Sequence, residues 1–270
     1  MNFLLNRRGL GKVSCSLIAS HSTKGLKVIR NDGRIPAADY VFKWGTTTTV
    51  REAGTVVNSS EAIHEASNKT GFRRKLGELA PKTWFVAAEV RFPAIVRPAA
   101  HSQGRNLYVV RNPEELLRAV EACGAGWYAS ELIDKTAEYR IYAAQGRAIG
   151  VGRKMPRDEQ TIAWNMAQGG TCKNVRWDEW PLRVVKASLE AFKLTGLDFG
   201  AVDVIVDREE KPYILEVNSA PTLANHRAQT FAKTFDYIVE HGKEPLPLVD
   251  RRGGYKKFIH PAVCGEAWIA

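Results

Sequence analysis

Three side chains in the last third of the sequence carry the kind of oxygen atoms that hold a divalent cation in proteins. Glu216 and Asn218 lie two residues apart at the end of an apolar run at 213–218, and Asp203 lies in an earlier apolar run at 199–206. Both runs have the length and composition of buried strands, and the polar segment between them is typical of a turn. The resulting hairpin would bring Asp203 near the other two residues. Carboxylate and amide oxygens are ligands that Mg²⁺ prefers, so the sequence predicts a magnesium site on this hairpin.

A simpler alternative is a hairpin whose outer face happens to carry acids. Side chains alternate between the two faces of a strand, so Glu216 and Asn218 should share one face, and Leu215 and Val217 the other. A charged side chain within an apolar strand costs free energy unless it is paired or bound to a metal. Because both strands carry such an acid, we favour the metal site over the simpler alternative.

One loop has a composition that suits anion binding. It contains small residues at 99–106 and lies between predicted strands at 92–98 and 107–110. Its Gly and Ser residues would let backbone N–H groups come close to a phosphate. The loop is not a Walker phosphate loop, because no Gly-Lys-Ser/Thr follows it and no helix begins there. On spacing alone, it predicts a plain hairpin.

The elements predicted around these segments would hold them in place. The clearest helix runs over 112–124, with Asn112 as its cap and Pro113 in its first turn. Its apolar stripe, expected to be buried, is Leu116, Leu117, Val120 and Cys123. Further helices are predicted at 9–24, 181–195 and 225–240, with two helical stretches between Ser59 and Pro81. Further strands are predicted at 26–30, 40–44, 55–58, 127–133, 137–144 and 148–154.

In their order along the chain, the segments from about Asn58 to Pro221 resemble those of the ATP-grasp ligases. The strongest match is the hairpin, because ligases of this family use an acid on one strand and Glu-x-Asn on the next to hold the magnesium ions of ATP. The resemblance implies an α/β fold with α+β lobes: a small N-terminal α/β lobe (1–80), a central nucleotide-binding lobe (81–135) and a C-terminal lobe with the metal site (136–270). ATP would lie between the last two lobes. The metal ligands implied are Asp203, Glu216 and Asn218.

The resemblance also implies which residues bind the nucleotide. Asn68-Lys69 is similar to the Asx-Lys dipeptide whose lysine reaches the phosphates, with asparagine in place of the commoner aspartate. The strand at 92–98 resembles the family pattern Pro-x-Val-x-Lys-Pro, but Arg97 stands where the family usually has lysine. Arginine keeps the charge and adds a planar fork, but its longer, planar head is not equivalent to lysine, so the replacement is compatible with phosphate binding and puts the catalytic rate in doubt. The implied set is Lys69, Arg97, Ser102, Gln103, Gly104, Glu131, Leu132, Ile133 and Glu138.

Within that set, the family places the residues equivalent to 131–133 around the adenine and the residue equivalent to Glu138 on the ribose. The strand that carries Glu138 looks like the family's acid-x-Arg strand, which implies that Arg140 contacts the substrate or the transferred phosphate. Lys154 would add positive charge near the phosphates. Asn165 opens a segment similar to the Asn-x-x-x-Gly-Gly element beside the acceptor site in the glutamate-adding branch of the family.

Each of these assignments has a simpler alternative when the resemblance is set aside. Lys69 alone predicts a surface lysine, and Glu138 with Arg140 predicts a surface ion pair that contributes little. The strand at 127–133 alone predicts a core strand with one exposed acid. The segment at 165–170 alone predicts a flexible loop.

The composition is that of an ordinary globular protein with a strong positive charge. The chain has 270 residues, of which 44% are hydrophobic and 25% charged, and a formal net charge of +10. No apolar run approaches the roughly 18 residues that span a membrane, and the first residues lack the order of a signal peptide, so we expect a cytoplasmic protein. The four cysteines are scattered, so neither a zinc site nor a disulfide framework is expected. Basic clusters, which indicate either an anionic partner or a solvated face, occur at Arg73-Arg74-Lys75 and at Arg251, Arg252, Lys256 and Lys257.

The expected activity is the ATP-dependent joining of a carboxylate to an amine through an acyl-phosphate, with Mg²⁺ as cofactor. The carboxylate would belong to a small molecule or a peptide, with amino acids among the candidates. Two alternatives stay open. The replacement at Arg97 motivates an ATP-grasp module that binds nucleotide without turnover, and the charge of +10 with seven tryptophans motivates a basic nucleic-acid-binding protein.

Overall fold

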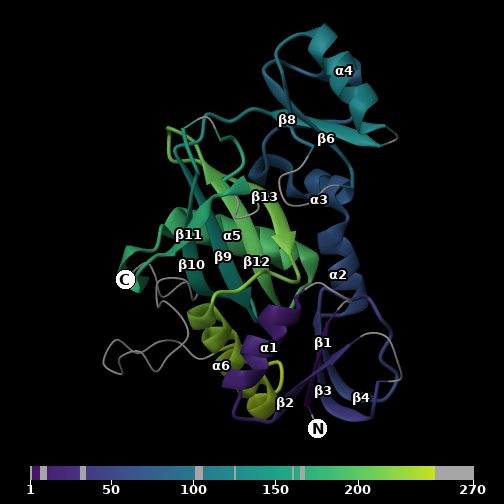
Figure 1. The fold of residues 1–270 in the computed structure, drawn as a ribbon, viewed down its shortest axis with the longest axis vertical. Helices are drawn as coiled ribbons and strands as arrows, with labels where there is room; N and C mark the ends of the chain where they lie inside the picture. Colours follow the sequence, from purple (N-terminus) through teal and green to yellow (C-terminus); the bar gives the residue numbers. More distant parts are fainter. Residues whose placement is uncertain are drawn as a thin grey trace.

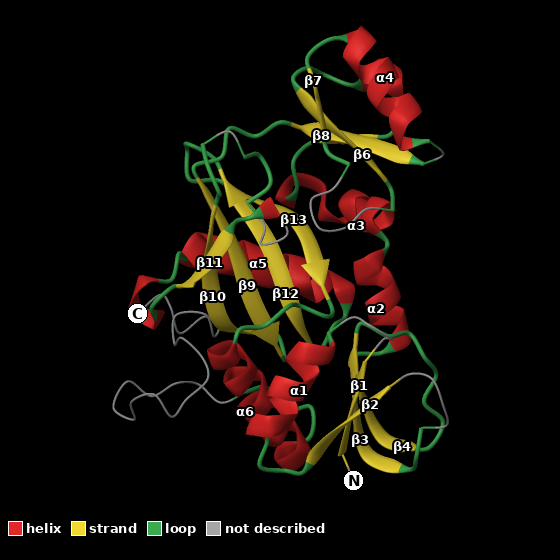
Figure 2. Ribbon diagram, viewed as in Figure 1, coloured by secondary structure: helices red, strands yellow, loops and turns green. Residues whose placement is uncertain are grey.

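The computed structural model describes residues 2–6, 11–30, 35–100, 106–124, 126–159, 161–164 and 168–246. These residues form three β-sheets that succeed one another along the chain (Figure 1). The N-terminal sheet and the middle sheet lie at opposite ends of the molecule, and the C-terminal sheet lies between them (Figure 2). The lobe boundaries drawn from the sequence stay a prediction. No helix within these described ranges is both long enough and apolar enough to cross a bilayer.

The N-terminal sheet consists of parallel strands in the order β2-β1-β3-β4. Strands β2 (Leu26–Arg30), β3 (Ala38–Trp44) and β4 (Ala53–Val57) lie close to their predicted positions. Strand β1 (Asn2–Asn6) was not predicted, although it pairs with both β2 and β3. Helix α1 (Lys12–His21) joins β1 to β2, because neighbouring parallel strands need a crossover connection.

Two short helices, α2 (Ser60–Ser67) and α3 (Lys69–Leu76), carry the chain from the N-terminal sheet towards the middle sheet (Figure 1). Asn68 caps α3, since its Oδ1 accepts a hydrogen bond from the backbone N–H of Gly71 at 3.1 Å. Such a cap satisfies one of the N–H groups that a helix leaves without an internal partner. The cap also fixes Lys69, a predicted phosphate ligand, as the first residue of the helix.

The middle sheet is antiparallel, with its strands in the order β5-β8-β6-β7. Helix α4 (Pro113–Cys123) packs against it and shares a core with Val96 and other buried residues of the sheet. The prediction that Leu117 is buried was wrong: it is 70% exposed, while Leu116 and Ala119 are buried. A helix that packs on one side only buries a narrow stripe, and Leu117 falls outside that stripe. The strands are β5 (Thr83–Trp84), β6 (Ala94–Pro98), β7 (Tyr108–Val110) and β8 (Trp127–Glu131).

The C-terminal sheet is antiparallel, with its strands in the order β11-β10-β9-β12-β13. Helix α5 (Leu182–Thr195) covers one face, where its buried side chains meet Ile141, Val202 and Val204. The predicted hairpin is formed by β12 and β13. The strands are β9 (Ala137–Ala144), β10 (Arg147–Met155), β11 (Thr171–Asn174), β12 (Phe199–Val206) and β13 (Pro212–Asn218).

A β-bulge interrupts the hairpin beside the predicted metal ligands. Asp203 pairs with Glu216, but the residue after Asp203 pairs with Ile214, so Leu215 has no partner. As a result Ile214 and Val217 both lie in the core shared with α5, and Leu215 is only half-buried. The strict alternation predicted for this strand, with Leu215 and Val217 on one face, was therefore wrong. A bulge shifts the alternation by one residue and re-aims the side chains beyond it.

Helix α6 (Asn225–His241) packs beside α1 on the other face of the C-terminal sheet (Figure 1). Its aromatic side chains enter a core that the N-terminal and C-terminal sheets share. The rings of Phe42 and Phe235 lie 4.3 Å apart between centroids, and those of Trp44 and Phe199 lie 5.4 Å apart. The two sheets are thus joined by one continuous core, while the middle sheet has a core of its own.

Candidate active site

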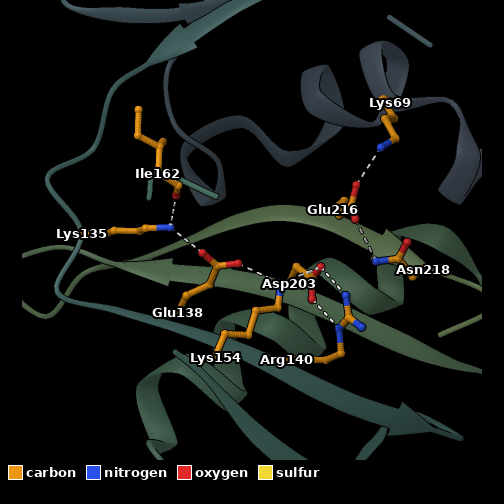
Figure 3. A network of polar contacts seen from close by, with 9 residues as sticks. All are labelled: Lys69, Lys135, Glu138, Arg140, Lys154, Ile162, Asp203, Glu216 and Asn218. Atoms are coloured by element: carbon orange, nitrogen blue, oxygen red, sulfur yellow. Dashed lines mark hydrogen bonds and ion pairs between the residues drawn. The ribbon is translucent and has the colours of Figure 1, made fainter. Parts of the chain in front are cut away.

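The face of the C-terminal sheet opposite α5 carries the predicted metal ligands (Figure 3). Asp203 on β12 lies directly across from Glu216 on β13. Asn218, two residues further along β13, donates a hydrogen bond from its Nδ2 to Oε1 of Glu216 at 3.1 Å. The hairpin therefore brings the two acids and the amide together on one face.

Asp203 is buried and held by two cations from neighbouring strands. Arg140 on β9 donates from Nε to Oδ1 at 2.7 Å and from Nη2 to Oδ2 at 2.8 Å, while Nζ of Lys154 on β10 lies 3.1 Å from Oδ2. Burial alone would raise the pKa of Asp203, but these two cations outweigh burial and hold the pKa below its ordinary range. The forked contact fixes both planar groups, as is typical of Arg–carboxylate pairs.

Glu138 lies beside this pair and is held by two lysines. It is 4% exposed, and its Oε1 accepts from Nζ of Lys154 at 2.8 Å while its Oε2 accepts from Nζ of Lys135. Lys135 also donates to the carbonyl of Ile162 at 2.7 Å. Glu138 and Arg140 therefore do not form the surface pair that their spacing alone would predict. Sequence reasoning missed Lys135, because it precedes the strand and its spacing from Glu138 indicates no shared strand face.

On the other side of the site, Glu216 is bound by a residue from a distant helix. Nζ of Lys69, at the start of α3, lies 2.7 Å from Oε2 of Glu216, whose side chain is 29% exposed. Burial would raise the pKa of Glu216, but the charge of Lys69 and the hydrogen bonds from Lys69 and Asn218 together lower it. A lysine and an acid predicted for separate roles therefore meet at one point of the site.

Together these residues form a charged network that crosses four strands and one helix (Figure 3). It contains four cations and three carboxylates, so most of its charges neutralise one another and one positive charge remains. A buried network of this kind is stable only when each charge has close partners, because burial removes the stabilisation that water gives. Its members are Lys69, Lys135, Arg140 and Lys154 with Glu138, Asp203 and Glu216.

The donor set on the hairpin suits a hard divalent cation. Asp203 and Glu216 supply carboxylate oxygens from facing positions, and the amide of Asn218 stands next to Glu216. Mg²⁺ prefers such oxygens, and one or two carboxylates suffice when phosphates supply further ligands. Lys69, Arg140 and Lys154 place positive charge beside these two acids, where a metal ion would also place it. The residues present therefore fit the ion.

The remaining predicted residues that the structure describes lie on the middle sheet or directly after its strand β8. Arg97 is on β6, directly across from Tyr128 on β8. Glu131 is exposed at the end of β8, and residues 132–133 follow it half-buried. Their contacts with a nucleotide stay a prediction. Ser102, Gln103, Gly104 and Asn165 lie outside the described residues, as do the basic residues Arg251, Arg252, Lys256 and Lys257.

Comparisons with known proteins bear on the family of this chain. The RimK-like ATP-grasp domain matches residues 79–236. The D-alanine–D-alanine ligase of Fusobacterium nucleatum subsp. nucleatum is 25% identical over 179 residues, which are 62% of this chain and 60% of that protein. A second such ligase, from Laribacter hongkongensis, is 26% identical over 52% of this chain and 48% of its own length. The chain thus spans between half and three fifths of these relatives.

Solved structures extend the likeness of fold to most of the chain. The ATP-grasp ligase PsnB, complexed with a minimal precursor, Mg and ADP, superposes with a TM-score of 0.65 at 12% identity and covers 90% of this chain and 97% of that one. The D-alanine–D-alanine ligase from Bacillus anthracis complexed with ATP gives a TM-score of 0.62 at 15% identity, with 90% and 97% covered. At these identities the likeness shows the fold alone. Because the domain match extends over more than half of the sequence, from the middle sheet through the hairpin into α6, the chain belongs to the RimK-like ATP-grasp family.

Proposed function

We propose that the chain is an ATP-dependent ligase that joins a carboxylate to an amine through an acyl-phosphate. The observation that carries the proposal is the pairing of Asp203 and Glu216 across the hairpin, with Arg140 and Lys154 on one acid and Lys69 on the other. This arrangement offers anionic ligands for a metal and cationic ligands for phosphates on a single face. Phosphoryl transfer needs both, because charge builds up on the transferred group.

Each charged residue has a distinct part in this reaction. Lys69 and Arg97 would hold the phosphate chain of ATP, and Arg140 and Lys154 would stabilise the γ-phosphoryl group as a substrate carboxylate oxygen attacks it and ADP leaves. When bound to the hairpin acids, Mg²⁺ supplies further neutralisation of phosphate charge. The amine then attacks the acyl carbon, phosphate leaves, and the nitrogen releases a proton. No side chain needs to act as a nucleophile.

The substrates belong to this proposal as well. Relatives are D-alanine–D-alanine ligases, and PsnB was also solved with the precursor peptide PsnA2. These relatives support an amino acid or a peptide as the source of the carboxylate or of the amine. A weaker second candidate is nucleotide binding without turnover. The observation that favours it is Arg97, at a position where the family usually has lysine.

Two measurements test the proposal. ATP with Mg²⁺ should raise the melting temperature of the wild-type protein, and Glu216→Gln should abolish the shift because the hairpin then lacks one anionic ligand. Glu209→Gln, an exposed acid in the turn of the same hairpin, is the matched control and should behave as wild type. Release of ADP that depends on an added amine, across a panel of amino acids and short peptides, separates a ligase from a nucleotide binder. A wild-type protein whose melting temperature ignores ATP and Mg²⁺ would contradict both readings.

A further inference from the structure

Arg73 in helix α3 is a buried cation that forms no ion pair with a carboxylate of the described residues. It is 7% exposed, and its buried Nη1 has no hydrogen-bond partner among the described residues. Its guanidinium lies over the ring of Tyr128, with Cζ 5.8 Å from the ring centroid. Its neighbours Arg74 and Lys75 are exposed, so the basic cluster predicted from the sequence divides into one buried and two solvated members. A buried guanidinium is costly unless something compensates its charge.

The position of Arg73 on α3 directs it towards the proposed nucleotide site. Arg73 follows Lys69 by four residues, and side chains spaced in this way lie on the same face of a helix. Lys69 reaches Glu216 at 2.7 Å. The face of α3 that carries Arg73 is therefore the one turned towards the hairpin acids.

A second guanidinium lies close by on the middle sheet. Arg97 and Tyr128 are directly opposite on the antiparallel strands β6 and β8, and side chains opposite one another project from the same face with Cβ atoms about 5 Å apart. Because Arg73 contacts the ring of Tyr128, it lies next to Arg97. Nε of Arg97 is also buried, and no group in the described part of the chain bonds to it. Two positively charged forks thus adjoin one tyrosine.

The charges around this point do not balance within the described chain. Glu216, whose charge acts on Arg73, already binds Lys69 and Asn218, and no described carboxylate forms an ion pair with Arg73 or Arg97. Burial lowers the pKa of Arg73 and the charge of Arg97 lowers it further, whereas Tyr128 and Glu216 raise it. Like charges side by side in a buried place call for an anion with several negative groups.

We propose that Arg73 binds the phosphate chain of the nucleotide together with Arg97, as a phosphate ligand additional to those implied by the sequence motifs. The inference rests on the proposed function, since it takes the anion to be a nucleoside triphosphate. Guanidinium groups suit this role because their forked N–H groups match pairs of phosphate oxygens. Tyr128 would hold the guanidinium of Arg73 by its ring while the N–H groups face the phosphates.

A purely structural role for Arg73, as a cation packed on Tyr128, predicts different results. If packing were its function, removing the charge would lower the stability of the ligand-free protein and would weaken every ligand alike. If phosphate binding is its function, the ligand-free protein holds an uncompensated buried charge. Its removal should then leave the melting temperature unchanged or raise it, while affinity falls only for ligands that carry phosphates.

The experiment compares Arg73→Gln with Arg74→Gln by isothermal titration with three probes: AMPPNP with Mg²⁺, tripolyphosphate and adenosine. Arg74 is the matched control, because it is the next residue on the same helix and its exposed guanidinium lies 3.8 Å from the ring centroid of Phe85. We expect Arg73→Gln to weaken AMPPNP and tripolyphosphate by about 10- to 100-fold, as for the loss of hydrogen bonds to a charged group, with adenosine unchanged. Arg73→Lys should recover part of the loss, because it keeps the charge without the fork.

The outcomes separate this inference from the proposed function. Equal AMPPNP affinity in Arg73→Gln and Arg74→Gln would overturn the role of Arg73 and leave the ligase proposal intact. The same holds if Arg73→Gln weakens adenosine as much as AMPPNP, or if it melts well below the control without ligand. A wild-type protein that binds neither AMPPNP nor tripolyphosphate would overturn the nucleotide site itself, and the role of Arg73 with it.

Discussion

Two groups of buried charges lie at the candidate site, and they differ in whether their charges have close partners. Around Asp203, each cation has a carboxylate within 3.1 Å, and Arg140 contacts both oxygens. Around Tyr128, Arg73 and Arg97 each keep a buried N–H group without an acceptor in the described part of the chain. The first group is complete when the chain folds. The second still lacks hydrogen-bond acceptors. Glu216 lies between the two groups, because it is opposite Asp203 on the hairpin and its charge also acts on Arg73.

This contrast separates residues whose charges are already paired in the ligand-free protein from residues whose charges are paired only when a ligand binds. A buried charge with close partners is tolerated by the fold and becomes strongly destabilising when a partner is removed. An unpaired one costs stability in the ligand-free protein and recovers it on binding. Substitutions in the paired group should therefore mainly lower stability, and substitutions in the unpaired group should mainly lower the affinity for the ligand.

The largest effect is expected when the paired group is broken. Asp203→Ala should lower the free energy of unfolding by about 3–5 kcal/mol, because Arg140 and Lys154 would be left buried without their shared carboxylate. Glu209→Ala, in the exposed turn after β12, is the control and should change stability little. Urea denaturation of the three proteins measures the difference. A loss for Asp203→Ala as small as that of the control would mean that the network contributes little to folding.

Acid should weaken the same group without any substitution. The pKa of Asp203 is lowered in the folded protein, so its contribution is fully present above its unfolded pKa of about 3.9 and is lost as pH falls below that value towards the folded pKa. The free energy of unfolding should accordingly fall between about pH 4 and pH 2, and less steeply in Asp203→Asn. Glu216, whose pKa is also lowered, should leave some slope in the variant. Identical slopes in both proteins would contradict the assignment.

The unpaired group should respond mainly through its ligand. At a concentration of AMPPNP with Mg²⁺ about 100 times its Kd, binding stabilises a protein by about 2.7 kcal/mol. If Arg97→Gln weakens binding about tenfold, it should lose about 1.4 kcal/mol of this stabilisation at the same concentration. Arg91→Gln, an exposed arginine shortly before β6, is the control. Equal ligand-induced shifts in melting temperature for the two variants would mean that Arg97 does not bind the nucleotide.

The smallest effect concerns the helix that joins the two groups. Asn68→Ala removes the cap of α3 and should cost about 1 kcal/mol of stability. Ser59→Ala removes the cap of α2, where the Ser59 hydroxyl accepts from the N–H of Ala62 at 3.1 Å, and should cost a similar amount. Only Asn68→Ala should also weaken AMPPNP binding, because only α3 carries Lys69 and Arg73. If both variants bind AMPPNP equally, the start of α3 does not position its cations.

Local signals in the sequence predicted much of this architecture. Asn112 and Pro113 marked the start of α4, and its cap bond to the N–H of Glu115 is 2.9 Å long. The two apolar runs with a polar turn predicted the hairpin that sets Asp203 across from Glu216. Such features depend on neighbours in sequence, so sequence reasoning reaches them.

Features set by packing between distant segments were out of reach. Strand β1 is short and pairs with two strands that follow it, so no local turn reveals it. The bulge at Leu215 depends on how β13 fits against β12, and it reversed the expected side-chain pattern. The burial of Arg73 beside Tyr128 joins a helix to a strand more than fifty residues later. A run of basic residues gives no indication of which member faces inward.

The core shared by the N-terminal and C-terminal sheets also bears on when the protein can finish folding. Phe42 from an early strand stacks on Phe235 from the last described helix, and Trp44 contacts Phe231 of that helix as well as Phe199. On the ribosome, the first sheet therefore waits with these rings uncovered until α6 has been synthesised. The chain through α6 must emerge before this shared core is complete. Contacts over so long a stretch of sequence make folding slow and leave apolar surface of the nascent chain exposed to aggregation.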